Sequence, residues 1–225
     1  MGLNKKYILF DLDGTLTDSK PGILKAVQYA AKYFGIDIKD NELDSYSYFV
    51  GPPLRESMKI NFGFDDEKAE LGVAKFREYY IPKGIYENSV YPGIDNLLKK
   101  LKDSGKTLIL ATSKVEAQAR TVLEHFDILK YFDFTAGCEV DGRRSKKDEV
   151  IEYCLEHFGI LSDEEKAQAV MIGDRNHDII GAGKNGIESI GVLYGYGSVE
   201  EITNGEYKAD YVVNDVDGLT ELLLV

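Results

Sequence analysis

Cysteine, basic residues and long apolar runs are all scarce in this sequence of 225 residues. Only two cysteines are present, Cys138 and Cys154, so a disulfide framework is excluded, and no cysteine spacing typical of a metal site exists. The 27 lysines and arginines are outnumbered by 39 aspartates and glutamates, which gives a formal charge of −12. An acidic protein has no broad electrostatic attraction for nucleic acid or anionic membranes, and we expect neither as a partner. An anionic ligand would need a few local cations, a metal ion or backbone N–H groups.

Two further absences concern location. No apolar run approaches the roughly 20 residues that a membrane-spanning helix needs. Lys5 and Lys6 are followed at once by an acidic motif instead of the apolar centre of a signal peptide. We therefore expect a cytoplasmic protein. Its 44% hydrophobic content, with 15 tyrosines and 10 phenylalanines, is sufficient for a sizeable core and argues against disorder.

Short, almost continuously apolar runs recur along the chain and are typical of parallel strands that are covered on both faces. The run at 6–11 is the first, and similar runs occur at 106–111, 132–138, 169–173, 187–192 and 209–214. Helical patterns, with apolar residues three and four apart, lie between most of these runs. This alternation predicts an α/β fold with a doubly wound parallel sheet.

One stretch, from about residue 20 to 91, has helical patterns and no convincing strand. The predicted helices of this stretch are 20–34, 39–48, 53–62 and 66–81. Turn-forming residues flank it at 15–19 and 82–92. We therefore predict an all-helical cap domain of residues 17–89, inserted into an α/β core of residues 1–16 and 90–225.

Two aspartates follow the first predicted strand, in the sequence Asp11-Leu-Asp13-Gly-Thr15. Ligands of open α/β sheets bind beyond the carboxyl ends of the strands. One aspartate could act there as a nucleophile and the other as a general acid and base, and Gly14 would allow the backbone to bend. Strands that end in an Asp-Gly turn are also common without any catalytic role, so this motif alone leaves both interpretations open.

Polar residues also follow other predicted strands. Thr112 and Ser113 come after 106–111, where a hydroxyl or N–H group could hold a phosphate oxygen or simply cap a helix. Asp174 and Asp178 come after 169–173, and their spacing puts both carboxylates in one helical turn, a donor set that suits Mg²⁺. A basic run at 143–147 precedes a further helix, and one of its lysines could neutralise substrate charge.

Taken together and in order, these motifs resemble the four signatures of the haloacid dehalogenase-like (HAD) hydrolase superfamily. The chain is similar to the branch that contains phosphoglycolate phosphatase and related small-molecule phosphatases, whose helical cap follows the first strand. The matching segments are DLDGTLTDS at 11–19, ATSK at 111–114, a lysine before a helix, and IGDRNHDIIGA at 172–182.

The resemblance implies catalytic roles for two aspartates and one lysine. Asp11 would attack phosphorus and form an aspartyl-phosphate. Asp13 would protonate the leaving oxygen and then activate water. Lys147 is our choice for the signature lysine because the apolar helix follows at the expected offset. Lys146 remains an alternative, since the prolines that often follow this lysine are missing.

The resemblance also implies ligands for substrate and metal. Thr112 would hold a phosphoryl oxygen, with the Ser113 N–H nearby. Mg²⁺ would be bound by Asp11, the Asp13 carbonyl and Asp174, with Asp178 as a ligand or as an acceptor for its waters.

The function that follows is a Mg²⁺-dependent phosphatase for a small phosphorylated metabolite, such as phosphoglycolate or a nucleoside monophosphate. Asp13 argues against a dehalogenase, because halide leaves without a proton. The alternatives are a phosphotransferase or sugar phosphomutase on the same fold, or a phosphate-binding protein without catalysis. Arg55, after the Gly-Pro-Pro turn at 51–53, could contact substrate from the cap or could be an ordinary solvated arginine. We expect a monomer or a homodimer.

Overall fold

The computed structural model describes residues 2–224 and divides the chain into two compact units. One unit comprises Met1–Thr17 and Val90–Val225, and the other comprises Asp18–Ser89. The two strands β2 (Thr17–Asp18) and β3 (Ser89–Val90) form a small sheet where the chain passes from one unit to the other. Each unit has its own core of buried apolar residues.

The larger unit contains a six-stranded sheet with the order β5-β4-β1-β6-β7-β8, and every neighbouring pair is parallel. The strands are β1 (Tyr7–Phe10), β4 (Thr107–Val115), β5 (Phe134–Cys138), β6 (Ala169–Gly173), β7 (Glu188–Val192) and β8 (Tyr211–Val213). Strands are added on one side of β1 up to β5 and on its other side from β6 onward. This reversal places β1 and its two neighbours at the point where α/β sheets usually bind ligands.

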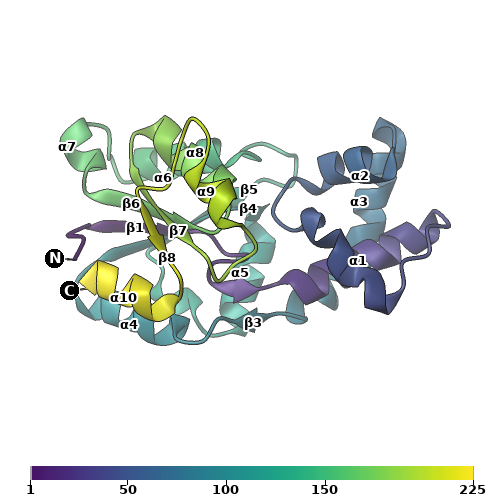
Figure 1. Ribbon diagram of the computed structural model, residues 1–225, viewed down its shortest axis with the longest axis horizontal. Coiled ribbons are helices and arrows are strands. Elements are labelled where there is room, and N and C mark those ends of the chain that lie inside the picture. The colour runs from purple at the N-terminus through teal and green to yellow at the C-terminus, as the bar shows by residue number, and fades with distance from the viewer. Residues whose placement is uncertain (1, 225) are drawn as a thin grey trace. The chain divides into compact units, whose positions relative to one another are not determined.

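Helices cover both faces of this sheet (Figure 1). They are α4 (Ile94–Asp103), α5 (Glu116–His125), α6 (Lys147–His157), α7 (Asp163–Lys166), α8 (Asn176–Asn185), α9 (Val199–Thr203) and α10 (Val216–Leu224), with a short 3₁₀ turn η3 (Leu129–Tyr131). Figure 1 shows α6 and α8 on one side of the sheet and α4 and α10 on the other.

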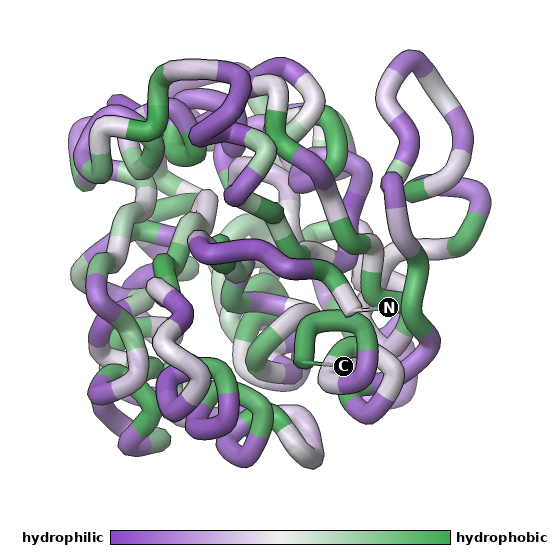
Figure 2. Tube along the Cα trace, turned by 90° about the vertical axis from the view of Figure 1, so that its left-hand side faces the viewer, coloured by the Kyte–Doolittle hydropathy of each residue, from purple (hydrophilic) through white to green (hydrophobic). Residues whose placement is uncertain are grey.

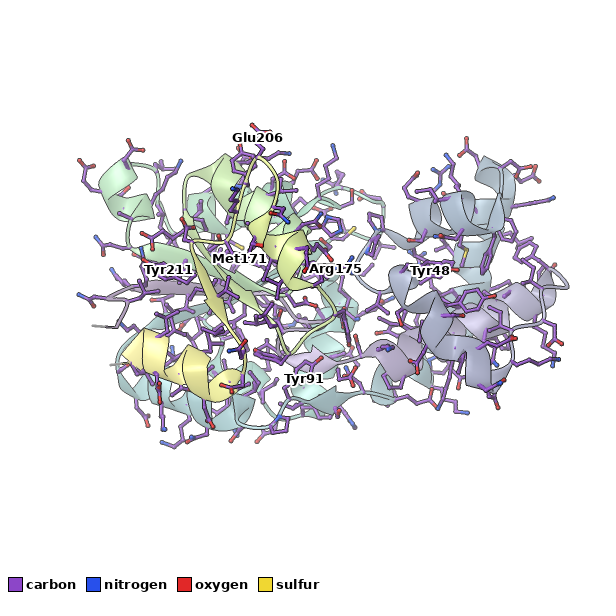
Figure 3. The ribbon with its side chains drawn as sticks, in the orientation of Figure 1. Tyr48, Tyr91, Met171, Arg175, Glu206 and Tyr211 are labelled. Atoms are coloured by element: carbon purple, nitrogen blue, oxygen red, sulfur yellow. The ribbon has the colours of Figure 1, made fainter. Side chains whose placement is uncertain are left out.

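The alternation of side chains along the strands explains this two-sided packing. Leu9 pairs in register with Ile109 and Met171, and all three are buried in one cluster with Val150 and Ile151 of α6. Figure 3 labels Met171 within this interior. The intervening residues of each strand point to the opposite face, so both faces of the sheet are apolar.

The segment that leads into β1 lies beside the last helix of the larger unit (Figure 2). The Leu3 N–H donates a hydrogen bond to the Leu222 carbonyl at 2.7 Å. The last helix is thereby tied to the segment that leads into β1.

The smaller unit is helical, with α1 (Lys20–Tyr33), η1 (Asp40–Phe49), α2 (Leu54–Phe62), α3 (Asp66–Tyr80) and η2 (Gly84–Tyr86). Its core contains Phe49, Met58 and Phe76. A Cβ atom at Gly72 would lie 2.3 Å from Met58 Sδ, so this glycine allows α2 and α3 to pack closely. The predicted fold class, a doubly wound parallel sheet with an inserted helical cap, is confirmed. The segment predicted as a helix at 39–48 is a 3₁₀ helix.

The predicted strand at 106–111 is too short. β4 continues to Val115, with an irregularity in its pairing with β5 between Ala111 and Val115. Thr112 and Ser113 therefore lie in a bulged strand, and the next helix starts only at Glu116. None of the helices in residues 2–224 is long and apolar enough to cross a membrane.

Candidate active site

Asp11 is the first residue after β1, and its backbone N–H donates to the Ile172 carbonyl of β6 at 2.9 Å. The chain then turns sharply, because Gly14 has a φ of +83°, a conformation that favours glycine. A Cβ atom at Gly14 would lie 2.2 Å from Asp174 Oδ2. The Asp-Gly turn therefore has a steric reason for its glycine, since it allows the β1 turn to approach the residue that follows β6.

Three carboxylates converge at this edge of the sheet. One oxygen each of Asp11, Asp174 and Asp178 lies within 4.8 Å of the others, and no second cluster of this kind occurs in the part of the chain that the structure describes. Asp174 follows β6, and Asp178 lies in the first turn of α8. A Cβ atom at Gly173 would lie 2.1 Å from the Asp178 Cγ, so a second glycine makes room for this group.

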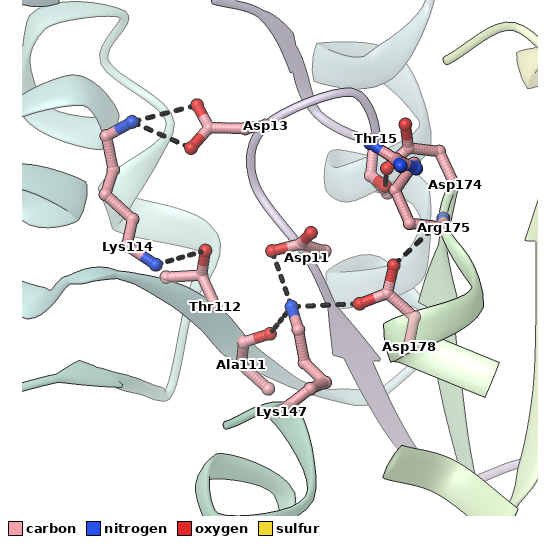
Figure 4. A network of polar contacts seen from close by, with 10 residues as sticks. All are labelled: Asp11, Asp13, Thr15, Ala111, Thr112, Lys114, Lys147, Asp174, Arg175 and Asp178. Atoms are coloured by element: carbon pink, nitrogen blue, oxygen red, sulfur yellow. Dashed lines mark hydrogen bonds and ion pairs between the residues drawn. The ribbon is translucent and has the colours of Figure 1, made fainter. Parts of the chain in front are cut away.

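Lys147, the first residue of α6, lies among these carboxylates (Figure 4). Its Nζ is 2.7 Å from Asp11 Oδ1 and 2.9 Å from Asp178 Oδ1, and it donates a hydrogen bond to the Ala111 carbonyl at 2.9 Å. The adjacent Lys146 is exposed. Of the two lysines that the sequence left open, Lys147 is the one that the structure brings to the carboxylates.

Burial and mutual repulsion govern the protonation of this cluster. Burial would lower the pKa of Lys147, but Asp11 and Asp178 raise it above its ordinary value, so the lysine is a cation. Burial raises the pKa of Asp11 to about 6, despite the opposing effect of Lys147 and with a further increase from Asp178. Burial also raises the pKa of Asp174, and Asp178 and Asp11 add to that rise.

These groups fit a divalent metal ion. Three ionised carboxylates and one ammonium would leave two negative charges in a buried site, and a divalent cation would balance them. Carboxylate oxygens are the donors preferred by hard cations such as Mg²⁺ and Ca²⁺. The expectation of a metal-binding acidic cluster is thus supported by the donor set.

The Asp13 side chain lies apart from the three-carboxylate cluster and pairs with Lys114 of β4 (Figure 4). The Lys114 Nζ donates to both carboxylate oxygens, at 2.9 and 2.7 Å, and both side chains are largely buried. No role for Lys114 follows from the sequence alone. Its place directly after Thr112 and Ser113 is the only feature of the sequence that points to it. The ion pair between Lys114 and Asp13 is not predictable from the sequence, because Lys114 lies in the irregular part of β4.

Thr112 is buried next to this pair, and its Oγ1 accepts a hydrogen bond from the Lys114 N–H at 3.3 Å. Ser113 is partly buried in the same bulge. Both residues therefore lie in the strand that is hydrogen-bonded to β1, toward the sheet edge where Asp11 lies. Their predicted contacts with a phosphoryl group stay predictions.

Arg55 belongs to the smaller unit, in the first turn of α2. Its guanidinium forms ion pairs with Glu56, Asp66 and Glu70. The pKa of Arg55 is raised, chiefly by its hydrogen bond to Glu70. Its proposed contact with substrate stays a prediction.

The loop after β7 contributes two groups that no sequence motif predicts. The Tyr196 N–H donates to Asp174 Oδ2 at 2.7 Å, and the Tyr194 hydroxyl donates to the Thr15 carbonyl at 2.9 Å. No motif marks these contacts, because one donor is a backbone N–H and the other is an isolated tyrosine.

Comparison with known proteins gives the family. Residues 8–192 match the family model of the haloacid dehalogenase-like hydrolases. The chain therefore belongs to the haloacid dehalogenase-like hydrolase family. It is a hydrolase enzyme, as the four motifs predict, and its relatives include phosphatases.

Three relatives show the range of activities in this part of the family. A 5'-nucleotidase of Pseudomonas aeruginosa is 43% identical over 195 residues, which are 87% of this chain and 86% of that protein. The tyrosine-protein kinase PtkA of Mycobacterium tuberculosis is 35% identical over 99% of this chain and 74% of its own length. A phosphoglycolate phosphatase of Vibrio cholerae is 30% identical over 98% of this chain and 97% of that protein.

Among solved structures, that of a predicted phosphatase from Clostridium acetobutylicum is 47% identical, with a TM-score of 0.89, and covers 96% of this chain and 97% of its own. The resemblance to the phosphoglycolate phosphatase branch is therefore confirmed.

Proposed function

We propose that this chain is a Mg²⁺-dependent phosphatase that hydrolyses a small phosphomonoester through an aspartyl-phosphate on Asp11. The observation that carries the proposal is the buried Asp11 carboxylate at the end of β1, with Oδ1 fixed 2.7 Å from the Lys147 ammonium. A phosphoryl dianion is repelled by carboxylates unless cations offset their charge. Lys147 provides one such cation beside the nucleophile.

The chain's own residues can be assigned to both halves of the reaction. An Asp11 oxygen forms a bond to phosphorus while the ester P–O bond breaks. Asp13, which Lys114 holds in this structure, gives its proton to the leaving oxygen. Asp13 then takes a proton from the water that attacks the aspartyl-phosphate, which releases phosphate and restores Asp11. Thr112 and the Ser113 N–H hold phosphoryl oxygens during both steps.

Mg²⁺ would be held by Asp11, Asp174 and the Asp13 carbonyl, with Asp178 binding it directly or through a water molecule. When bound, the ion withdraws negative charge from the phosphoryl oxygens. The raised pKa values of Asp11 and Asp174 support this assignment, because they reflect carboxylates that are buried without enough positive charge.

Nucleoside 5'-monophosphates are the first substrates to test. The relative with 43% identity is a 5'-nucleotidase, whereas the phosphoglycolate phosphatase relative is 30% identical. A cytoplasmic location is expected for an enzyme with such a substrate. A second candidate, transfer of a phosphoryl group to tyrosine, is favoured only by the likeness to PtkA.

The test is an assay of the purified protein with nucleoside monophosphates, phosphoglycolate, sugar phosphates and p-nitrophenyl phosphate. We expect the wild type to release phosphate, with EDTA abolishing this activity and Mg²⁺ restoring it. We expect the Asp11→Asn variant to release no phosphate, although its circular dichroism spectrum matches that of the wild type. Near-wild-type kcat in Asp11→Asn would refute the mechanism. ATP-dependent formation of phosphotyrosine, without release of phosphate from any monoester, would favour a tyrosine kinase. A requirement for a sugar bisphosphate would favour a mutase.

A further inference from the structure

The β7–α9 loop (residues 193–198) runs beside the carboxylate cluster and has no part in the mechanism above. Both of its ends are anchored. The Leu193 N–H donates to the Val213 carbonyl of β8 at 2.9 Å, and Ser198 caps α9 by accepting a hydrogen bond from the Glu201 N–H at 3.1 Å. The loop is therefore held at both ends by regular structure.

The middle of the loop contacts both segments that carry the metal-site carboxylates. Its Tyr196 N–H donates to Asp174 Oδ2, and its Tyr194 hydroxyl donates to the Thr15 carbonyl in the turn that follows Asp11. The Tyr194 ring also packs against Tyr91, with 5.0 Å between ring centroids. Figure 3 labels Tyr91 in the larger unit.

The loop can approach so closely only because two of its residues are glycines. A Cβ atom at Gly195 would lie 2.3 Å from both the Asp174 Cβ and the Gly14 carbonyl oxygen. A Cβ atom at Gly197 would lie 1.9 Å from the Asp174 carbonyl oxygen. Real Cβ atoms do not come this close to backbone, so any side chain here would displace the loop or Asp174.

The helix after the loop extends this support to α8. Glu201 Oε1 accepts hydrogen bonds from Arg175 Nε at 2.7 Å and from the Asn176 N–H at 3.2 Å. Arg175 and Asn176 form the start of the helix that carries Asp178. The segment from the loop to α9 therefore contacts the turn that follows Asp11, the Asp174 carboxylate itself and the start of the helix that carries Asp178.

We propose that the β7–α9 loop is a positioning element of the metal site, in which the Tyr196 N–H and the close approach of Gly195 and Gly197 fix the Asp174 carboxylate for the ion. This inference rests on the proposed function, because it assumes that the cluster binds Mg²⁺. Groups that orient metal ligands in this way affect metal affinity even though they do not touch the ion.

The test compares Gly195→Ala with Gly218→Ala, a matched control in α10, where a new Cβ would meet nothing closer than 3.4 Å. Metal-free protein is titrated with Mg²⁺ by calorimetry, and the midpoint of Mg²⁺-dependent thermal stabilisation is measured in parallel. We expect Gly195→Ala to bind Mg²⁺ roughly 10- to 100-fold more weakly, with activity recovering at high Mg²⁺, and Gly218→Ala to match the wild type.

Tyr194→Phe provides a second test if Gly195→Ala does not fold. It keeps the ring beside Tyr91 and removes only the hydrogen bond to Thr15, so we expect Mg²⁺ binding to weaken roughly two- to tenfold. A folded variant with a lowered melting temperature and unchanged Mg²⁺ affinity would show a merely structural role and overturn the proposal. A wild-type protein that binds no Mg²⁺ would instead refute the proposed function.

Discussion

Replacement of Lys147 by methionine removes the cation from a buried group of acids. The Lys147 side chain is only 3% exposed and contacts Asp11 and Asp178 at 2.7 and 2.9 Å. Removing one partner of a buried ion pair costs about 3–5 kcal/mol, because the remaining charges are left uncompensated. Since 1 kcal/mol shifts the melting temperature of a domain of 150–250 residues by about 2–4 °C, we expect the metal-free variant to melt roughly 6–20 °C lower.

The assay is thermal unfolding in EDTA, repeated with saturating Mg²⁺. We expect Mg²⁺ to restore much of the lost stability to Lys147→Met, because the ion supplies charge to the same carboxylates. Lys146→Met is the matched control, since this neighbouring lysine is exposed, and its unfolding free energy should change by less than about 0.5 kcal/mol. Equal melting temperatures for the two variants in EDTA would refute the charge argument.

Three further predictions concern the aspartates and the cap. Asp13→Asn should slow aspartyl-phosphate formation by about 10²–10⁴-fold for an alkyl phosphate and by less for an activated aryl phosphate, as measured by rapid quench; equal losses would count against Asp13 as the acid. Because the pKa of Asp11 rises to about 6 on folding, its proton favours the folded state, and this stabilisation is lost as the pH rises through about 6. In EDTA, Asp11→Asn should therefore melt above the wild type at pH 7.5 but not at pH 4.5, and a constant difference across this range would contradict the shift. Arg55→Ala should raise the KM for an anionic natural substrate and leave that for p-nitrophenyl phosphate nearly unchanged; parallel losses on both substrates would indicate a structural role.

The parallel sheet and the cluster of acids could both be predicted from the sequence, and the same physical reason explains both. Apolar runs such as 169–173 can be buried on both faces only as parallel strands, and the residues that follow such strands meet at one edge. The proximity of Asp11 and Asp174 could therefore be predicted from the sequence. Lys147 came from the resemblance to the family, as the lysine before an apolar helix, and Lys146 remained the alternative until the structure placed Lys147 beside Asp11.

The remaining features depend on local geometry that no periodicity encodes. The bulge in β4 gives Lys114 its position beside Asp13, and a run of apolar letters does not reveal a bulge. The contact from Tyr196 to Asp174 uses a backbone N–H, which every residue except proline carries. Glycines such as Gly195 are visible in the sequence, but only the structure shows which atoms their missing side chains would meet.

The central claim is that Asp11 carries the phosphoryl group during turnover, and mass spectrometry of acid-quenched protein tests it most directly. The protein is mixed with excess substrate and Mg²⁺, quenched within the first turnovers and digested. The account predicts a phosphoryl adduct on the peptide that contains Asp11, which decays on further incubation and is absent from Asp11→Asn. Rapid hydrolysis with no adduct on that peptide, together with turnover by Asp11→Asn, would contradict it.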